Sequence, residues 1–259
     1  MQNIFKKVFI GGTLLAASSI ASAENVGGVI WDPFEPFIDF AAQSSVYESN
    51  INFVGDNLYG VGKVNQMNGN SAFCPGCELT FEFGYTVAEV GDFDTNGTVN
   101  VIFNDGFINF YVDDSADFNF TDVTTATDGK LWLALEGHTD YDPLLGKFGE
   151  LFGELDAGFA LDDNNEEGEG SGLLNVTGGM AAHFFDTNTR DDFFAADVAD
   201  FNFTSSFQPF SNGGTTNDGL ALVGTAELIG DSIPEPGSLA LLGLGLLGLG
   251  AGAMRRRKA

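Results

Sequence analysis

Three oxygen-bearing side chains at alternate positions are the clearest metal-binding candidate in this sequence. Asp92, Asp94 and Asn96 stand where the first, third and fifth ligands of a calcium-binding loop stand, and Gly97 takes the sixth position, where such a loop turns sharply. The twelfth position is Phe103, although a calcium loop needs a bidentate glutamate there. We therefore predict at most a weak calcium site, formed by Asp92, Asp94 and Asn96.

The same segment has a structural interpretation, which we favour. Thr95-Asn96-Gly97-Thr98 separates two segments whose apolar residues alternate, and Asn-Gly is a preferred pair for a type I′ hairpin turn. The sequence therefore predicts a turn here, with weak calcium binding as an addition to it.

The two cysteines lie close together, as Cys74-Pro75-Gly76-Cys77. In a reducing cytosol this spacing is typical of a redox motif. The chain is predicted below to be exported, and no βαβ pattern surrounds the pair, so we predict a local disulfide between Cys74 and Cys77 that tightens a turn before a strand. Two sulfurs without a nearby histidine make a poor metal site.

Signals for catalysis are weak. His138 and His183 are the only histidines, and no H-E-x-x-H motif is present. Ser171 lies between two glycines, but Glu169 occupies a place where the nucleophile elbow needs glycine. A glycosidase needs two carboxylates at a defined separation, and the sequence cannot select such a pair from the 36 acidic residues of 24–233. We therefore predict no catalytic residues and no enzymatic activity, and a secreted hydrolase is the least favoured alternative.

The elements that would position these residues are mostly strands. Apolar and polar residues alternate with period two, and clusters of Gly, Asn and Asp separate the alternating segments. This pattern predicts an all-β fold, an antiparallel β-sandwich with a jelly-roll-like arrangement. The predicted strands lie in 79–87, 99–103, 107–112, 131–135, 173–177, 201–204 and 220–223.

One segment has helical spacing instead. Asp142 is a suitable N-cap and Pro143 fits the first helical turn. Apolar residues then recur at helical spacing, at Leu144, Leu145, Phe148, Leu151, Phe152 and Leu155. We therefore predict one short helix over 143–155, packed on a sheet.

A six-residue sequence occurs twice. Ala-Asp-Phe-Asn-Phe-Thr stands at 116–121 and again at 199–204, and each copy is followed at some distance by Asp-Gly and an apolar segment. A duplicated β unit and chance in a biased composition both explain this recurrence.

The charge of the central part excludes one class of partner. Residues 24–233 hold 36 acidic and four basic residues, a formal charge of −32, against −27 for the whole chain. Nucleic acid is therefore excluded, since its phosphates bind cationic side chains. The 26 phenylalanines argue against disorder. Screening by divalent cations and simple solubility of an exported protein both account for the acidity.

The N-terminal end has the pattern of a signal peptide. Lys6 and Lys7 precede an apolar segment at 8–17, and Ala21 and Ala23 supply the small residues of a cleavage site. We predict a signal peptide over 1–23 and an exported acidic domain over 24–230.

The C-terminal end combines three features in order over 231–259. Pro234, Glu235 and Pro236 come first. An uncharged apolar stretch at 238–254 follows, which predicts a single transmembrane helix. The four cations Arg255, Arg256, Arg257 and Lys258 come last and are expected on the cytoplasmic side of the inner membrane.

This order closely resembles the PEP-CTERM sorting signal of Gram-negative bacteria. The resemblance implies recognition by exosortase, processing near the Pro-Glu-Pro motif, and a transient or stable membrane anchor before the protein reaches the cell surface or extracellular matrix. Many species with such signals make exopolysaccharide and biofilm matrix. Segments at 128–133, 175–179, 185–188 and 203–207 resemble the bodies of uncharacterised proteins of this kind, for which no activity carries over.

Two binding roles follow from these features. The favoured one is an exported, non-enzymatic surface or matrix protein that associates with exopolysaccharide. The alternative is a carbohydrate-binding sandwich in which Trp31, Trp132 or tyrosines form sugar platforms, although Trp132 in its apolar segment reads more readily as a core residue. No cofactor is expected, apart from weakly bound calcium.

Overall fold

The computed structural model of this protein describes residues 23–32, 40–156, 161 and 167–233, and strands make up most of these described residues. All of these residues belong to one unit, 23–236, with its own hydrophobic core. The strands are β1 (Glu24–Val26), β2 (Val29–Trp31), β3 (Phe40–Ser49), β4 (Asn57–Met67), β5 (Glu78–Val90), β6 (Thr98–Asp113), β7 (Lys130–His138), β8 (Asp140–Asp142), β9 (Lys147–Gly149), β10 (Leu151–Asp156), β11 (Glu167–Gly178), β12 (Arg190–Asp191), β13 (Val198–Ala199), β14 (Phe201–Pro209) and β15 (Leu220–Gly230). Two short helical elements accompany them, the 3₁₀ helix η1 (Val123–Ala126) and α1 (Ala182–Phe185).

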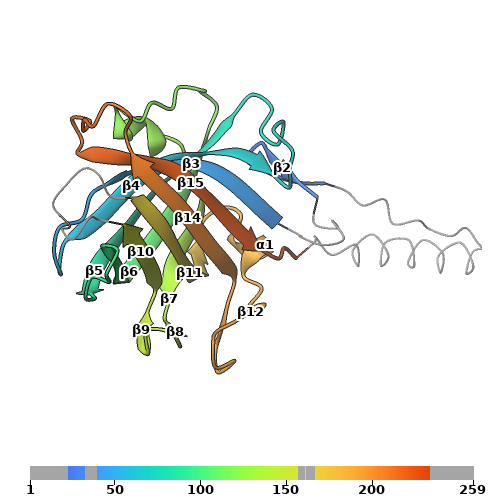
Figure 1. The fold of residues 1–259 in the computed structure, drawn as a ribbon. Coiled ribbons are helices and arrows are strands. Elements are labelled where there is room, and N and C mark those ends of the chain that lie inside the picture. The colour runs from blue at the N-terminus through green and yellow to red at the C-terminus, as the bar shows by residue number, and fades with distance from the viewer. Residues whose placement is uncertain (1–22, 33–39, 157–160, 162–166, 234–259) are drawn as a thin grey trace, which may run out of the picture. The chain divides into compact units, whose positions relative to one another are not determined.

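The main sheet is antiparallel and closes on itself (Figure 1). Its order is β10-β11-β14-β15-β3-β4-β5-β6-β7, and two further pairings complete the ring. The first half of β6 pairs with β10 and the second half with β7, and β11 divides its pairings in the same way. Strands β7 and β10 therefore share one place in the barrel, end to end. The all-β antiparallel prediction is confirmed.

Side chains fill the barrel. Along β5 the inward residues alternate with outward ones, and Leu79, Phe81, Phe83, Tyr85 and Val87 are all buried in the core. A closed barrel of about eight strands has an interior just wide enough for side chains to fill. An apolar cavity of about 30 Å³ remains inside, lined in part by residues of β3, β5 and β14, which is room for one or two water molecules at most.

Both tryptophans belong to the core, at one end of the barrel. Trp31 and Trp132 expose 3% and 1% of their surface and lie 6.0 Å apart between ring centroids. The Trp132 indole donates to the Val26 carbonyl at 3.0 Å, and the Trp31 indole donates to Ser232 Oγ at 3.2 Å. The interpretation of either residue as an exposed sugar platform is therefore wrong.

The helix predicted over 143–155 is also wrong. The segment forms β8, a turn, β9 and β10. The Asp142 carboxylate does accept the Leu144 and Leu145 N–H groups, at 2.7 and 3.1 Å, but it caps a turn that Gly146 closes with a φ of 69°. Strand pairing buries Leu151 and Leu155 at alternate positions, whereas Leu144 is 93% exposed. The helix in the described chain is α1 instead.

The recurring hexapeptide adopts two different structures. Residues 199–204 include the end of β13 and the start of β14. Phe201 and Phe203 of β14 point into the barrel core. Residues 116–121 form an irregular loop before η1, and Phe118 packs against a small cluster outside the barrel. The two copies are therefore not a duplicated β unit.

Asp200 of this hexapeptide joins three segments through hydrogen bonds. It is buried, and its carboxylate accepts backbone N–H groups from Val176, Thr187 and Asn188, each at 2.7 Å. These bonds tie the end of β11 and the segment after α1 to the start of β14. A buried carboxylate is tolerated because all its bonds are charge-assisted.

No helix within the described residues has the length and apolar character needed to cross a membrane. The predicted signal peptide, apart from Ala23, and the predicted transmembrane helix at 238–254 lie outside the described residues.

We expect Asp200→Asn to lower the free energy of unfolding by roughly 2–3 kcal/mol, because an amide offers one acceptor oxygen where three N–H groups converge. Asp117→Asn, at the same place in the other copy of the hexapeptide, is the matched control and should not destabilise the protein. Urea titration followed by circular dichroism measures both variants. Equal losses in the two would contradict the role given to Asp200.

Candidate functional site

The cysteine pair is structural. Cys74 and Cys77 form a disulfide in the turn between β4 and β5, and the Cys77 N–H also donates to the Cys74 carbonyl at 3.2 Å. Both side chains pack against the barrel core. The neighbouring Phe73 carbonyl accepts the Ile30 N–H at 2.7 Å, so the disulfide-closed turn supports the β1–β2 hairpin at its side.

The predicted calcium half-loop forms a hairpin turn between β5 and β6. The Asp94 N–H donates to the Thr98 carbonyl at 2.8 Å, and Asp94 Oδ1 accepts the Asn96 and Thr98 N–H groups at 2.7 and 2.9 Å. These hydrogen bonds hold the pKa of Asp94 below its usual value, and the bond from Thr98 has the largest effect. Only Gly97, with a φ of 90°, is left-handed in this turn, so the type I′ geometry expected of Asn96-Gly97 is wrong.

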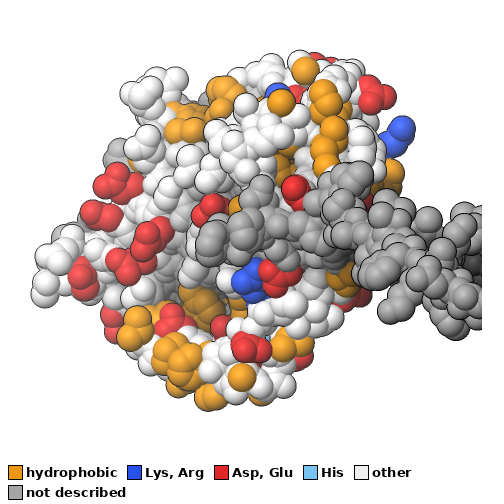
Figure 2. Space-filling view, turned by 90° about the vertical axis from the view of Figure 1, so that its right-hand side faces the viewer, with side chains coloured by type: hydrophobic (Ala, Val, Ile, Leu, Met, Phe, Trp, Pro, Cys, Tyr) orange, Lys and Arg blue, Asp and Glu red, His pale blue; other side chains and the backbone are white. Residues whose placement is uncertain are grey.

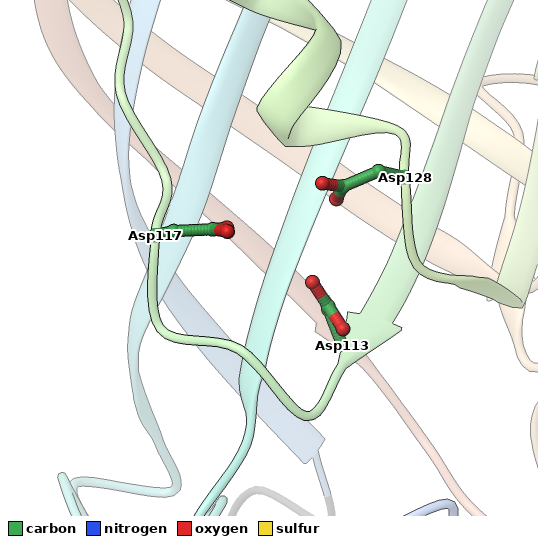
Figure 3. A group of neighbouring side chains, drawn as sticks. All are labelled: Asp113, Asp117 and Asp128. Carbon is green, nitrogen blue, oxygen red and sulfur yellow. The ribbon is translucent and has the colours of Figure 1, made fainter.

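Three other carboxylates converge on one point (Figure 3). Asp113 ends β6, Asp117 lies in the loop that follows, and Asp128 precedes β7. One oxygen from each lies within 4.8 Å of the other two. Desolvation, with the charges of Asp113 and Asp117, raises the pKa of Asp128. Such a group of oxygens is suited to a hard cation such as Ca²⁺.

A neighbouring ion pair holds this loop in place. Glu78 is buried on β5, its Oε2 lies 2.7 Å from Lys63 Nζ, and its Oε1 accepts the Asp117 and Phe118 N–H groups at 3.0 and 2.8 Å. The loop backbone is therefore fixed beside the three carboxylates. Sequence reasoning missed this group because its members are separated by a turn and η1, and no spacing rule joins them.

The two histidines lie in different surroundings. His138 is buried at the end of β7, where Nδ1 lies 3.1 Å from Asn175 Nδ2 and Nε2 has no hydrogen-bond partner among the described residues. His183 is exposed on α1 and its ring lies 4.0 Å from that of Phe184. The structure does not bring the two together.

Glu150 is a carboxylate near His138 with a shifted pKa. It lies half-buried before β10, and its Oε2 accepts the Gly106 N–H at 2.7 Å. Burial raises its pKa above the ordinary value, and the charges of Asp105 and Glu136 act in the same direction.

An open groove lies on the outer face of the barrel, between the loop before η1 and the hairpin that joins β14 to β15. Its aromatic members are Tyr47, Phe120 and Phe210, and its volume is about 760 Å³. The Tyr47 and Phe120 rings are stacked, with centroids 4.3 Å apart and planes 5° apart, and the Phe210 ring lies 5.8 Å from that of Phe120. No sequence pattern indicates this site, because the three rings come from distant segments.

Another aromatic surface is formed by β8, β9 and the loop after β12. Tyr141 contacts Phe148, Phe193 and Phe194, with ring centroids 5.0 to 5.6 Å apart. Phe148, Phe193 and Phe194 are 62%, 52% and 56% exposed. Hydrophobic side chains gather along the lower edge of the face in Figure 2, and acidic side chains are spread over that face while basic ones are few.

The remaining sequence-predicted sites fall at the ends. The sorting residues Pro234, Glu235 and Pro236 and the basic residues 255–258 lie outside the described residues, as does Ala21 of the cleavage site. Ala23 is exposed at the start of the described body.

Comparison with known families matches residues 232–258 to the PEP-CTERM protein-sorting motif. The chain carries a PEP-CTERM sorting motif. No curated protein and no solved structure matches the chain. The motif is a substrate signal for exosortase, and it supports export and exosortase-dependent sorting of this PEP-CTERM protein. Its first residue, Ser232, is the acceptor of the Trp31 indole bond, so the motif begins directly at the edge of the folded body.

We expect millimolar calcium to raise the melting temperature of this PEP-CTERM protein, because a bound cation relieves repulsion among acidic groups. Two variants locate the effect. Asp128→Asn should remove the calcium response if Asp113, Asp117 and Asp128 form the site, and Asp94→Asn should remove it if the half-loop of Asp92, Asp94 and Asn96 does. Calorimetry in calcium and in chelator provides the measurement, and equal melting temperatures in both would exclude a calcium site.

We expect Glu150→Gln to change the pH dependence of stability. The raised pKa of Glu150 means that protonation favours the folded state, so this contribution is complete below the unfolded pKa and is lost as the pH rises through the folded value. The glutamine can still accept the Gly106 N–H. The variant should therefore melt higher than the wild type at pH 7, and the difference should shrink as the pH falls toward about 4. A difference that does not vary over this range would contradict the assigned cause.

Proposed function

We propose that this protein is a non-enzymatic component of the cell surface or extracellular matrix, delivered there through its exosortase signal. The PEP-CTERM motif at 232–258 carries this proposal. Cleavage of a signal peptide after Ala23 and passage through the inner membrane would precede sorting. A helix at 238–254, with the cations at 255–258 on the cytoplasmic side, would hold the chain in the membrane until exosortase acts near Pro234-Glu235-Pro236.

The body has properties that suit an extracellular location. Its main sheet is closed, so its long strands leave few backbone groups available for edge-to-edge aggregation. A disulfide closes the turn at 74–77, and disulfides persist in oxidising compartments. The charge of −32 keeps copies of the body apart at high local density.

A non-enzymatic role is favoured by what the described residues bring together. The barrel interior holds side chains around a cavity of about 30 Å³, too small for a substrate. His138 is buried beside Asn175 and His183 lies on Phe184, and neither contact resembles the pairing of a base with a nucleophile. We therefore propose association with exopolysaccharide or biofilm matrix rather than its hydrolysis.

A carbohydrate-binding module is the second candidate. The tryptophans on which this idea first depended are buried. The outer groove of Tyr47, Phe120 and Phe210 supports it instead, because half-buried aromatic rings and uncharged polar groups line that groove together.

We expect deletion of Pro234–Ala259 to abolish retention at the cell surface and to release the body into the medium or periplasm, because the signal for exosortase and the anchor are both lost. Fractionation of the producing cells with an antibody against the body measures this. Leu144→Ala, in an exposed turn, is the control and should be sorted like the wild type. Unchanged surface display of the deletion variant would refute the sorting role.

A further inference from the structure

The outer groove has walls that are fixed in the fold. One wall is the loop of Phe118 and Phe120, and the other is the hairpin between β14 and β15, which carries Phe210; the two lie side by side at one end of the barrel in Figure 1. Glu78 of β5 holds the backbone of Phe118, and Thr80 of the same strand donates to the Ala126 carbonyl at 2.8 Å. The loop therefore has a defined position before any ligand arrives.

The floor of the groove is a second, small hydrophobic cluster outside the barrel. Val61, Ala126 and Leu220 are fully buried in it, and Tyr47, Phe118 and Phe210 pack on them. Tyr47 points outward from β3 because its neighbour Val46 points into the core. The aromatic rings are thus supported from below and keep their orientation, which reduces the entropy lost when a ligand binds.

The groove is uncharged in a strongly anionic body. Beside its aromatic rings it is lined by hydroxyl and amide side chains, such as Gln208, Asn212 and Thr216, and no Asp, Glu, Lys or Arg of the described part of the chain lines it. The adjacent groove on the same face is lined by Glu154, Asp156, Glu167 and Glu169. The field of a body of charge −32 disfavours an anionic ligand, and the described lining of the groove offers no carboxylate to pair with a cationic one, so this lining suits an uncharged ligand best.

We propose that this groove binds a neutral saccharide chain. The faces of sugar rings present C–H groups, which pack favourably on the negative face of an aromatic ring such as that of Phe120. Sugar hydroxyls both donate and accept hydrogen bonds, which matches the amide of Gln208 and the hydroxyl of Thr216. The volume of about 760 Å³ lies in the range of small-ligand sites and has room for more than one sugar ring.

The groove continues across the outer face of β14, β15 and β3. This extended surface favours a polymer over a single sugar as the ligand. Gln208 and Val223 also line the adjacent groove, so the two are joined. Beyond them the outward residues Ser206, Thr225 and Ser45 lie opposite one another on β14, β15 and β3. A neutral chain that leaves the aromatic rings would meet a row of hydroxyl groups. The inference rests on the proposed extracellular function, for which it names the class of partner.

The test is affinity electrophoresis of the protein in its processed form, purified from the producing cells. The gels contain neutral dextran, hydroxyethylcellulose or galactomannan, or anionic alginate as the charged comparison. We expect at least one neutral polymer to retard the protein and alginate to have no effect. Phe120→Ala should weaken binding about tenfold, as loss of a central aromatic contact does, and Gln208→Ala, an exposed strand residue, should weaken it without altering the circular dichroism spectrum.

Phe148→Ala removes an exposed ring from the other aromatic surface and is the matched control, which should bind like the wild type. Retardation by no neutral polymer, retardation by alginate alone, or equal binding of all three variants would overturn the proposal. Because the assay uses purified protein, it is independent of sorting. A protein that binds dextran but is not displayed would refute the proposed location, and a displayed protein that binds none of the neutral polymers would refute only the groove.

Discussion

Closure of the main sheet is the constraint on which the rest of the structure depends. Strands β6 and β11 are long enough to take two successive partners each, and β10 and β7 fill the space between them end to end. Without β10, half of β6 and half of β11 would present unpaired backbone groups. The short segment at 151–156 therefore completes a ring of hydrogen bonds, and its strand conformation follows from the two edges that it must join.

This constraint explains which parts of the fold could be predicted from sequence. The β5 and β6 strands follow from alternation at Leu79–Val87 and Phe107–Val112, because one face of each is buried in the barrel. The apolar residues at 144–155 fit helical spacing as well as strand spacing. The strand is favoured by the edges of β6 and β11 that it pairs with, and a local sequence pattern contains no information about those edges. The identical hexapeptides make the same point. Phe201 is buried in the core and Phe118 packs outside the barrel, so their surroundings decide the structure and not their sequence.

The candidate sites divide in the same way. Cys74 and Cys77 are close in the chain, so their pairing was predictable, and the hairpin at Asp94–Thr98 was too, although its turn type was not. The carboxylates of Asp113, Asp117 and Asp128 come from separate segments, and Glu78 holds the loop that carries Asp117. The pairing of β3, β15 and β14 brings Tyr47 and Phe210 together, and Phe120 joins them from the loop before η1, which Glu78 holds. Sites built by tertiary contact leave no spacing to recognise.

The junction between body and tail has a mechanical consequence. Asp231, at the end of β15, pairs with Arg190 at 3.1 Å, Ser232 accepts the bond from the Trp31 indole, and the Ile233 N–H donates to the Phe184 carbonyl at 2.7 Å. A force on the C-terminal tail would act on these three contacts before it acted on β15. That strand is hydrogen-bonded to a neighbour on both sides. Tension on a tethered copy would therefore have to break these contacts before it could separate β15 from β14 and β3 in the sheet.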